Sequence, residues 1–325
     1  MLDILLDAVT ALFAPATAAF ALAAIGLNFH FGLTGLLNMG HAGFMLLGMY
    51  GYAISTQNGL PIYVALVIGV LAAAAFGLLL GWPTLKLRGD YLAIATISAA
   101  ELIRYLGRSN SLQALTGGST GIRGSDFKFT FEELSPLPDE NITILFWTNH
   151  GTKSSSWWLH IVAWVIVLLF ALLFWQLARS PWGRVLKGIR EDEDAVRSLG
   201  KNVYAYKMQA LVLGGVIGAL GGILWALGNS VQPDSMGRPT TFWLWTLLLL
   251  GGAATVFGPI LGSMIFWSAL VIVKGLSSAF IPTSVLSPVE LEPFSLVLVG
   301  VTLMCLVVFR PQGILGNKRE LAFND

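Results

Sequence analysis

Long apolar segments recur along this chain, and they constrain its fold more than any other feature of the sequence. A helix needs about 20 consecutive apolar residues to cross a bilayer. Segments close to that length occupy residues 8–29, 33–55, 62–83, 90–107, 157–178, 208–228 and 291–309. The segment 241–280 is longer, and Gly251-Gly252 and Gly258-Pro259 interrupt it, so it predicts either a tight helix hairpin or a re-entrant pair.

The composition agrees with this pattern. Of the 325 residues, 55% are hydrophobic and 11% are charged, whereas a soluble domain carries about 25% charged residues. The 36 glycines suit helices that pack closely in a membrane. We therefore expect an all-α, polytopic helical membrane protein with about eight or nine membrane segments, in one domain over residues 1–325.

Basic residues near the ends of the spans predict the orientation, because cytoplasmic loops are enriched in lysine and arginine. The loop 179–207 holds seven of them, and others lie in the loop 84–89 and in the tail after residue 309. We expect these regions to be cytoplasmic. The N-terminus, with Asp3 and Asp7 and no nearby basic residue, is then expected outside, with the first apolar segment retained rather than cleaved.

Residues 108–156 form a long external loop in this topology. A β-prone patch lies around 127–131, and Trp147, Trp157 and Trp158 near the return to the membrane are typical of an interfacial belt. A loop of this length either docks an external partner or serves as a passive cap, and the sequence leaves both open.

Signatures of catalysis are missing from the sequence. It contains no phosphate-binding G-x-x-x-x-G-K-[ST] loop, no G-x-S-x-G elbow and no H-E-x-x-H motif. The single cysteine, Cys305, and the scattered histidines give no metal-ligand spacing, and no basic patch interleaved with aromatic residues suggests nucleic acid. We therefore expect a protein that is not an enzyme, holds no cofactor or metal, and does not bind nucleic acid.

Polar residues within apolar segments are candidates for a solute path, since they are costly in a membrane. Asn38 and His41 are three positions apart, which would place them on one face of a helix. They either line a path or form an interhelical hydrogen bond. Glu101 and Arg104 have the same spacing and can pair, either structurally or as part of a gate.

A run of small polar residues, LTGGSTGI, follows at 115–122. Its hydroxyls and backbone N–H groups could face a small zwitterion, or the run could simply form a turn. The candidate path residues in it are Thr116, Gly117, Gly118 and Thr120. GVIGALGG, with glycines at fourfold spacing, is interpreted as a helix-packing stripe.

The loop 179–207 contains the most charged stretch of the chain, GIREDEDAVRSLG at 188–200. Ser180-Pro181 predicts a helix start, and the acids from Glu191 to Asp194 predict the start of a second, short helix. Glu193 and Arg197 are expected to pair, and Gly200 to end the helix. Ala195, Val196 and Leu199 would form a small apolar face.

The spans offer few titratable groups that could couple transport to an ion gradient. Energy is therefore expected from another subunit, and the short charged helix is either the contact for that subunit or a solvated connector. The candidate coupling residues are Arg190, Glu191, Asp192, Glu193, Asp194, Ala195, Arg197 and Gly200.

Several blocks of the sequence resemble a known family. Asp194-Ala195-Val196, followed by Gly200, is similar to the Glu-Ala-Ala-x-x-x-Gly motif of ABC importer permeases, with Asp for Glu and Val for the second Ala. The blocks GLTGLLNMGHAGF (32–44), LRGDYLAIATISAAELIR (87–104), LTGGSTGI (115–122), GRVLKGIREDEDAVRSLG (183–200), GGAATVFGPILG (251–262) and FRPQGILG (309–316) resemble those of LivM-type branched-chain amino acid permeases, in the same order.

This resemblance implies a bacterial inner-membrane importer for leucine, isoleucine and valine. A second homologous permease would complete a heterodimer, two cytosolic ATPases would bind residues 190–200, and an external binding protein would deliver the solute. The mechanism would be alternating access. The same blocks also resemble urea and short-chain amide permeases, and a self-contained channel, an ion-coupled carrier and a membrane scaffold remain as alternatives.

Overall fold

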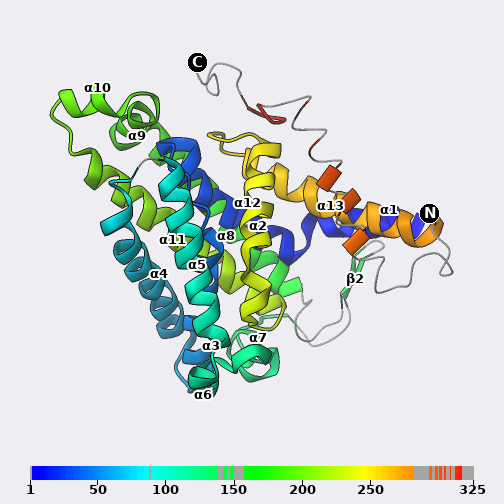
Figure 1. The fold of residues 1–325 in the computed structure, drawn as a ribbon. Coiled ribbons are helices and arrows are strands. Elements are labelled where there is room, and N and C mark those ends of the chain that lie inside the picture. The colour runs from blue at the N-terminus through cyan, green and yellow to red at the C-terminus, as the bar shows by residue number, and fades with distance from the viewer. Residues whose placement is uncertain are drawn as a thin grey trace.

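The structure, a computed structural model, describes residues 2–87, 89–137 and 157–280, the strands at 142–144 and 147–149, and scattered positions between 293 and 316. The described part is a bundle of helices (Figure 1). Its longer helices are α1 Leu2–Phe13, α2 Pro15–Asn28, α3 His41–Gln57, α4 Ile62–Thr84, α5 Gly89–Arg108, α8 Trp157–Arg179, α9 Pro181–Glu191, α11 Val203–Gly228, α12 Arg238–Gly251 and α13 Gly258–Phe280.

Shorter elements join these helices. They are the π-helical turn η1 Phe29–Leu33, the short helices α6 Gln113–Thr116, α7 Phe129–Glu132 and α10 Glu193–Ser198, and the 3-10 turns η2 Asn110–Leu112, η3 Gly118–Thr120, η4 Gly124–Asp126 and η5 Pro233–Met236. Strands β1 Ile142–Ile144 and β2 Trp147–Asn149 pair antiparallel.

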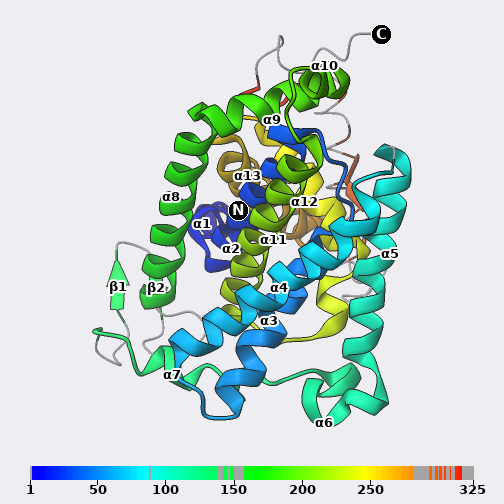
Figure 2. The same cartoon turned by 90° about the vertical axis from the view of Figure 1, so that its left-hand side faces the viewer.

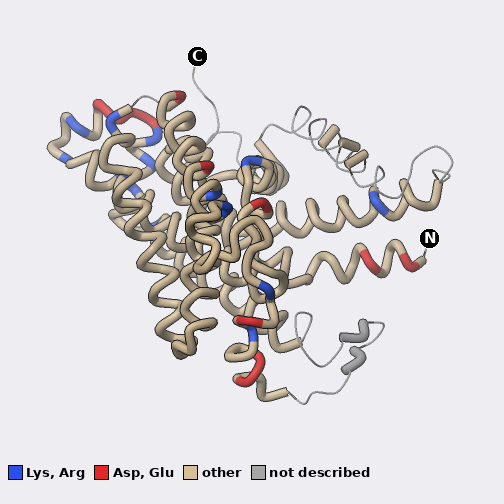
Figure 3. The backbone as a smooth tube through the Cα atoms, turned by 60° about the horizontal axis from the view of Figure 1, so that its bottom comes forward, with Lys and Arg blue, Asp and Glu red and all other residues tan. Residues whose placement is uncertain are grey.

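Five of the described helical segments are long and apolar enough to cross a membrane. They are Pro15–Leu33, Ile62–Thr84, Trp157–Arg179, Val203–Gly228 and Gly258–Phe280. Many of the charged residues lie near the ends of helices, and long stretches of the helices carry none (Figure 3). These features confirm the expected class, a polytopic helical membrane protein.

The centre of the bundle is the pair α2 and α11. Every residue of α2 from Thr17 to Asn28 is buried, which is typical of a helix surrounded by other helices. Its many alanines allow α11 to approach closely, and the glycines of α11 face backbone on both sides. A Cβ at Gly221 would lie 2.7 Å from the carbonyl oxygen of Ala19, so this crossing has no room for a side chain.

Two predicted spans have the wrong boundaries. The predicted span 8–29 is broken at Ala14, where α1 ends and Pro15 begins α2, because proline cannot donate the hydrogen bond that a continuous helix requires. The predicted span 33–55 begins too early, because residues 35–40 are not helical and α3 starts at His41. Residues 29–33 instead extend α2 as the π-helical turn η1.

The segment 241–280 divides into α12 and α13, joined by a turn at 252–257. The 14 residues of α12 extend about 21 Å, which is shorter than the apolar core of a bilayer. Helix α13 runs sideways out of the bundle beside α1 (Figure 1), and Ser268 Oγ donates to the carbonyl of Ala8 over 3.1 Å.

The first part of the predicted external loop is folded. Residues 110–137 form short helical turns that include α6 and α7. The expected β-prone patch is wrong, because residues 129–132 form α7, whose Phe131 packs on Trp158 with ring centroids 6.1 Å apart. Of the predicted span 291–309 only scattered positions are described, and the basic residues of the tail lie outside the described residues.

Candidate functional site

Helices α9 and α10 form an elbow at one end of the bundle (Figure 2). Ser180 caps α9 as predicted, since its Oγ accepts a hydrogen bond from Gly183 N over 3.2 Å, and Pro181 occupies the first turn. Leu186 and Ile189 are buried against the bundle. The elbow is therefore seated on the transmembrane helices by its apolar face.

The second helix begins two residues later than predicted. Glu191 ends α9, and Asp192 is the N-cap of α10, with its Oδ1 accepting from Asp194 N at 2.9 Å and Ala195 N at 3.0 Å. A short carboxylate side chain at this position satisfies the free N–H groups of the first turn. Gly200 follows α10 with a φ of +74°, which confirms its predicted role at the helix end.

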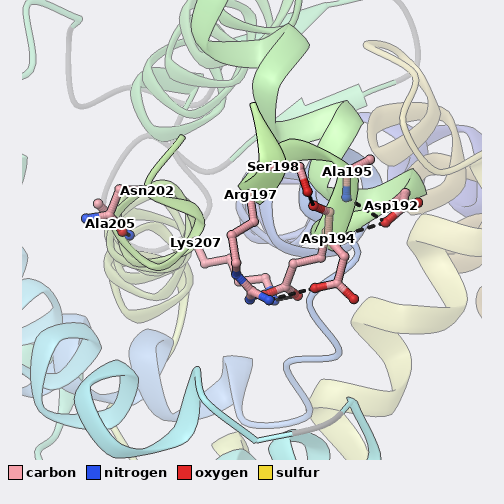
Figure 4. A network of polar contacts seen from close by, with 9 residues as sticks. Asp192, Asp194, Ala195, Arg197, Ser198, Asn202, Ala205 and Lys207 are labelled. Atoms are coloured by element: carbon pink, nitrogen blue, oxygen red, sulfur yellow. Dashed lines mark hydrogen bonds and ion pairs between the residues drawn. The ribbon is translucent and has the colours of Figure 1, made fainter. Parts of the chain in front are cut away.

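Ion pairs distinguish the two acids at the start of α10 (Figure 4). Glu193 accepts from Arg197 over 2.8 Å, as predicted, and its other oxygen pairs with Lys207 of α11. Asp194 pairs with Arg197 over 2.6 Å, but its side chain is 87% exposed. Glu193 thus fastens α10 to α11, while Asp194 and Arg197 remain on the outer surface.

The predicted apolar face of α10 is divided between two sides. Val196 is buried, and it lies against Gly188 of α9. Leu199 is 79% exposed and Ala195 is also exposed. The surface available to a partner therefore consists of Ala195, Leu199 and the Asp194–Arg197 pair.

Arg190, at the end of α9, connects the elbow to the interior of the bundle. Its Nη1 donates to the carbonyl of Gly32 in the π-helical turn over 2.5 Å. The stem of Arg190 lies against Gly35, where a Cβ would be 3.0 Å from Arg190 Cγ. Gly35 also has a φ of +71°, so both its space and its backbone angle favour glycine.

The turn that Arg190 holds leads into a buried polar cluster, which we define as His30, Asn38 and His41. Asn38 and His41 do not share a helical face as predicted, because Asn38 lies in the non-helical segment and His41 begins α3. Asn38 Nδ2 is 3.1 Å from His30 Nδ1, and His30 Nε2 is 2.9 Å from the carbonyl of Leu211. Since that carbonyl only accepts, Nε2 carries the proton and Nδ1 accepts from Asn38.

His41 lies beside His30, with ring centroids 5.3 Å apart. Neither of its ring nitrogens is hydrogen-bonded to any residue that the structure describes. Gly218 of α11 makes room for this ring, because a Cβ there would lie 2.5 Å from His41 Nε2. The glycine stripe of α11 therefore accommodates the histidines as well as neighbouring helices.

Hydrogen bonds tie the segment 28–42 to three more elements. Met39 N donates to Thr96 Oγ1 of α5 over 3.0 Å, and Ala42 N donates to Thr241 Oγ1 of α12 over 3.1 Å. The Asn28 side chain holds the turn between α12 and α13, donating to the carbonyl of Thr255 and accepting from Ala254 N, both over 2.8 Å. The segment 28–42, with the non-helical residues at its centre, thus connects the elbow, α5, α11 and α12.

Glu101 belongs to an ion network at the end of α5. Its Oε2 accepts from Arg104 over 2.8 Å, which confirms the predicted pair. Arg104 also pairs with Asp234 of η5, and Arg108 lies 3.6 Å from the other oxygen of Asp234. On the opposite side, Arg238 Nε of α12 is 3.6 Å from Glu101 Oε1.

The run 115–122 forms a compact turn. Thr116 Oγ1 donates to the carbonyl of Leu112 over 3.0 Å and accepts from Gly118 N, while Thr120 Oγ1 donates to the carbonyl of Gly117 over 2.8 Å. Gly117 and Gly118 both have positive φ. The hydroxyls of Thr116 and Thr120 therefore form hydrogen bonds within the turn, which favours the structural interpretation of this run.

The candidate path residues consequently occupy three different places: the polar cluster, the ion network and the turn. Sequence reasoning missed His30, Asp234 and Arg238. His30 was recognisable as a polar residue within an apolar span. Asp234 and Arg238 lie at the end of a loop, and they come close to their partners on α5 only in the folded protein. Among the described residues, no group of three His, Cys, Asp or Glu side chains could hold a metal ion.

Comparisons with known proteins give the family. Residues 10–307 match the profile of the branched-chain amino acid transport system / permease component. The high-affinity branched-chain amino acid transport system permease protein LivM of Escherichia coli (strain K12) is 31% identical over 93% of this chain and 69% of its own length. LivM of Salmonella typhimurium is 30% identical over the same shares. A chain of PsaBC from Streptococcus pneumoniae, solved in complex with Fab, has a TM-score of 0.47 and 15% identity over 96% of this chain and 97% of its own.

The helical bundle with five apolar spans and an elbow seated at their ends is a multi-pass membrane protein of the transport-permease class. Within that class, the chain belongs to the family of branched-chain amino acid transport system permease components.

Proposed function

We propose that this chain is a permease subunit of an ATP-driven importer for branched-chain amino acids, working by alternating access. The observation that carries this proposal is the family match over residues 10–307, together with a relative named LivM that is 31% identical over 93% of the chain. A chain without a phosphate-binding loop needs ATPase subunits to supply the energy, and the elbow offers them a contact.

The proposed contact consists of the exposed side of α10. Asp194, Arg197 and Leu199 point away from the bundle, while Glu193 and Val196 hold the helix in place. A rigid helix with a fixed base can transmit force from an ATPase to the membrane helices. Arg190 would relay that movement to the break at 35–40, because it bonds the carbonyl of Gly32.

The proposed orientation places the elbow in the cytoplasm and the loop 108–156, with the N-terminus, outside the bacterial inner membrane. Seven basic residues in the loop 179–207 support it. An external binding protein would deliver the solute on the side of that loop, and a second permease would complete a heterodimer around the path.

Two substitutions in the elbow test the coupling assignment. Asp194→Lys reverses an exposed charge, and Gly200→Pro is incompatible with the φ of +74° at that position. Each should reduce co-purification of the ATPase subunits while leaving membrane insertion intact. Lys187→Ala on α9 is the matched control. Unchanged co-purification of the ATPases with both variants would contradict the coupling assignment.

A further inference from the structure

A shallow hollow of about 490 Å³ lies on the outer flank of α5, and it combines two kinds of surface. Its lining residues are Ile97, Ser98, Glu101, Leu102, Tyr105 and Arg238. Ile97, Leu102 and Tyr105 supply apolar and aromatic surface, and a carboxylate and a guanidinium from different helices meet within the hollow. No other candidate path residue lines it.

The two charged groups are only loosely paired. Glu101 Oε2 is bound by Arg104 at 2.8 Å, but Oε1 is 3.6 Å from Arg238 Nε, which is too far for a hydrogen bond. Arg238 is 61% exposed, and its terminal nitrogens make no hydrogen bond to the residues described by the structure. Glu101 therefore has one acceptor oxygen available, and the terminal N–H groups of the Arg238 guanidinium are available as donors.

Helix α5 is not among the five segments that are apolar enough to cross a membrane alone, and Glu101 and Arg238 would be costly to expose to lipid. Leu92, Thr96, Ala100 and Gly107 of α5 are buried in the bundle, and Ala99 and Ile103 pack against it while partly exposed. The remaining surface carries Glu101, and Arg238 stands beside it. Charged groups on a membrane helix normally face a protein partner or a water-filled path rather than lipid. In the assembled transporter we therefore expect this flank to line the solute path.

We propose that this hollow is a passage site for an aliphatic α-amino acid in its zwitterionic form. The ammonium group of the ligand would bind Glu101 Oε1, and the carboxylate of the ligand would accept hydrogen bonds from the Arg238 guanidinium. These two contacts would replace the loose Glu101–Arg238 ion pair. The side chain of the ligand would lie against Ile97, Leu102 and Tyr105. The proposal rests on the function proposed above and identifies where this subunit contacts the solute.

Protection of an introduced cysteine tests the site directly. In a Cys305→Ser background, Ser98→Cys places a thiol in the hollow, and Leu106→Cys places one on the same helix outside it. In the transporter assembled with its ATPases and partner permease, leucine should slow labelling of Ser98→Cys by a thiol reagent and leave Leu106→Cys unaffected. Neither 4-methylpentanoate, which lacks the ammonium, nor 3-methylbutylamine, which lacks the carboxylate, should protect.

Adding Arg238→Gln to Ser98→Cys should raise the leucine concentration needed for protection about tenfold or more, because a charged hydrogen bond is lost. This variant leaves the Glu101–Arg104 pair in place, so it does not disturb the packing of α5. Equal protection of both thiols, no protection of Ser98→Cys, no labelling of it at all, or protection that survives Arg238→Gln would overturn the proposal.

ATP-driven leucine uptake by the same preparations, measured after the external binding protein is added, distinguishes the passage site from the proposed function. Uptake without protection at Ser98→Cys overturns the passage site and leaves the proposed function standing. A correctly assembled transporter that takes up no branched-chain amino acid overturns the proposed function itself.

Discussion

Asn38 makes hydrogen bonds through both its side chain and its backbone. Its amide nitrogen reaches His30, its Oδ1 accepts from Gly40 N over 2.9 Å, and its backbone carbonyl accepts from Trp245 Nε1 over 3.1 Å. The non-helical segment has few backbone partners of its own. Asn38 therefore replaces the hydrogen bonds that a helix would have supplied.

Replacing Asn38 should destabilise the protein. Asn38→Ala leaves the buried acceptor of His30 and the N–H of Gly40 unpaired, which we expect to lower the free energy of unfolding by about 1–3 kcal/mol. Thermal unfolding of the purified protein in detergent measures this change. Asn58→Ala at the exposed end of α3, where the amide only caps Ile54, is the control and should have a much smaller effect.

His41 is a buried histidine without a hydrogen bond to the described residues. Buried polar groups are normally paired, and an unpaired one raises the free energy of the state that contains it.

At the scale of elements, the glycine stripe of α11 fixes how close the central helices can come. A Cβ at Gly218 would lie 2.5 Å from the ring of His41, whereas one at Gly228 would meet only Leu159, at 4.0 Å. Gly218→Ala should therefore lower the yield of monodisperse protein in size-exclusion chromatography, because α11 must shift. Gly228→Ala should behave like the parent protein, and equal behaviour of the two variants would contradict this packing.

Two of the polar contacts that join the elbow to the bundle have different roles. Glu193 ties α10 to Lys207 of α11, and Arg190 ties α9 to the π-helical turn. The Glu193–Lys207 pair fixes the position of α10, whose exposed side is the proposed contact for the ATPases. The Arg190 contact leads to the only segment that hydrogen-bonds α5, α11 and α12 together within the described residues.

Arg190→Ala should uncouple ATP hydrolysis from the liganded binding protein without releasing the ATPases from the transporter. The ATPases should still co-purify, because the outer side of α10 is unchanged, but stimulation of ATP hydrolysis by the liganded binding protein should fall several-fold. Lys187→Ala, one turn earlier on α9, is expected to retain stimulation. Loss of ATPase binding in Arg190→Ala would assign this residue to the interface instead.

The sequence predicted those elements whose signals are local. The capping pattern of Ser180-Pro181 and the spacing of Glu193 and Arg197 each depend on residues within one or two turns, and both are confirmed. The non-helical segment 35–40 was missed because it follows an apolar span without an interruption that the sequence shows. Its form depends on Trp245 and Thr96, which hydrogen-bond Asn38 and Met39 and lie far away in the sequence.

The candidate site was predictable only in part for the same reason. Glu101 and Arg104 could be paired from their spacing, but Asp234 and Arg238 come from the connection before α12 and the start of that helix. Asn38 and His41 were recognised as polar residues in an apolar region, yet their surroundings depend on His30 and on the glycines of α11.

The whole molecule is a membrane bundle, and its proposed energy source and solute delivery reside in other subunits. The five apolar spans form the body, the elbow is the proposed input from the ATPases, and the flank of α5 is the proposed contact with solute. Each end is linked to the break at 35–40, through Gly32 on one side and Thr96 on the other.

Uptake of radioactive leucine into proteoliposomes tests the central claim most directly. The account predicts ATP-dependent uptake only when this chain is reconstituted with its partner permease, both ATPases and the binding protein, with competition by isoleucine and valine and none by urea. Leucine uptake by this chain alone, without ATP or any partner, would contradict it.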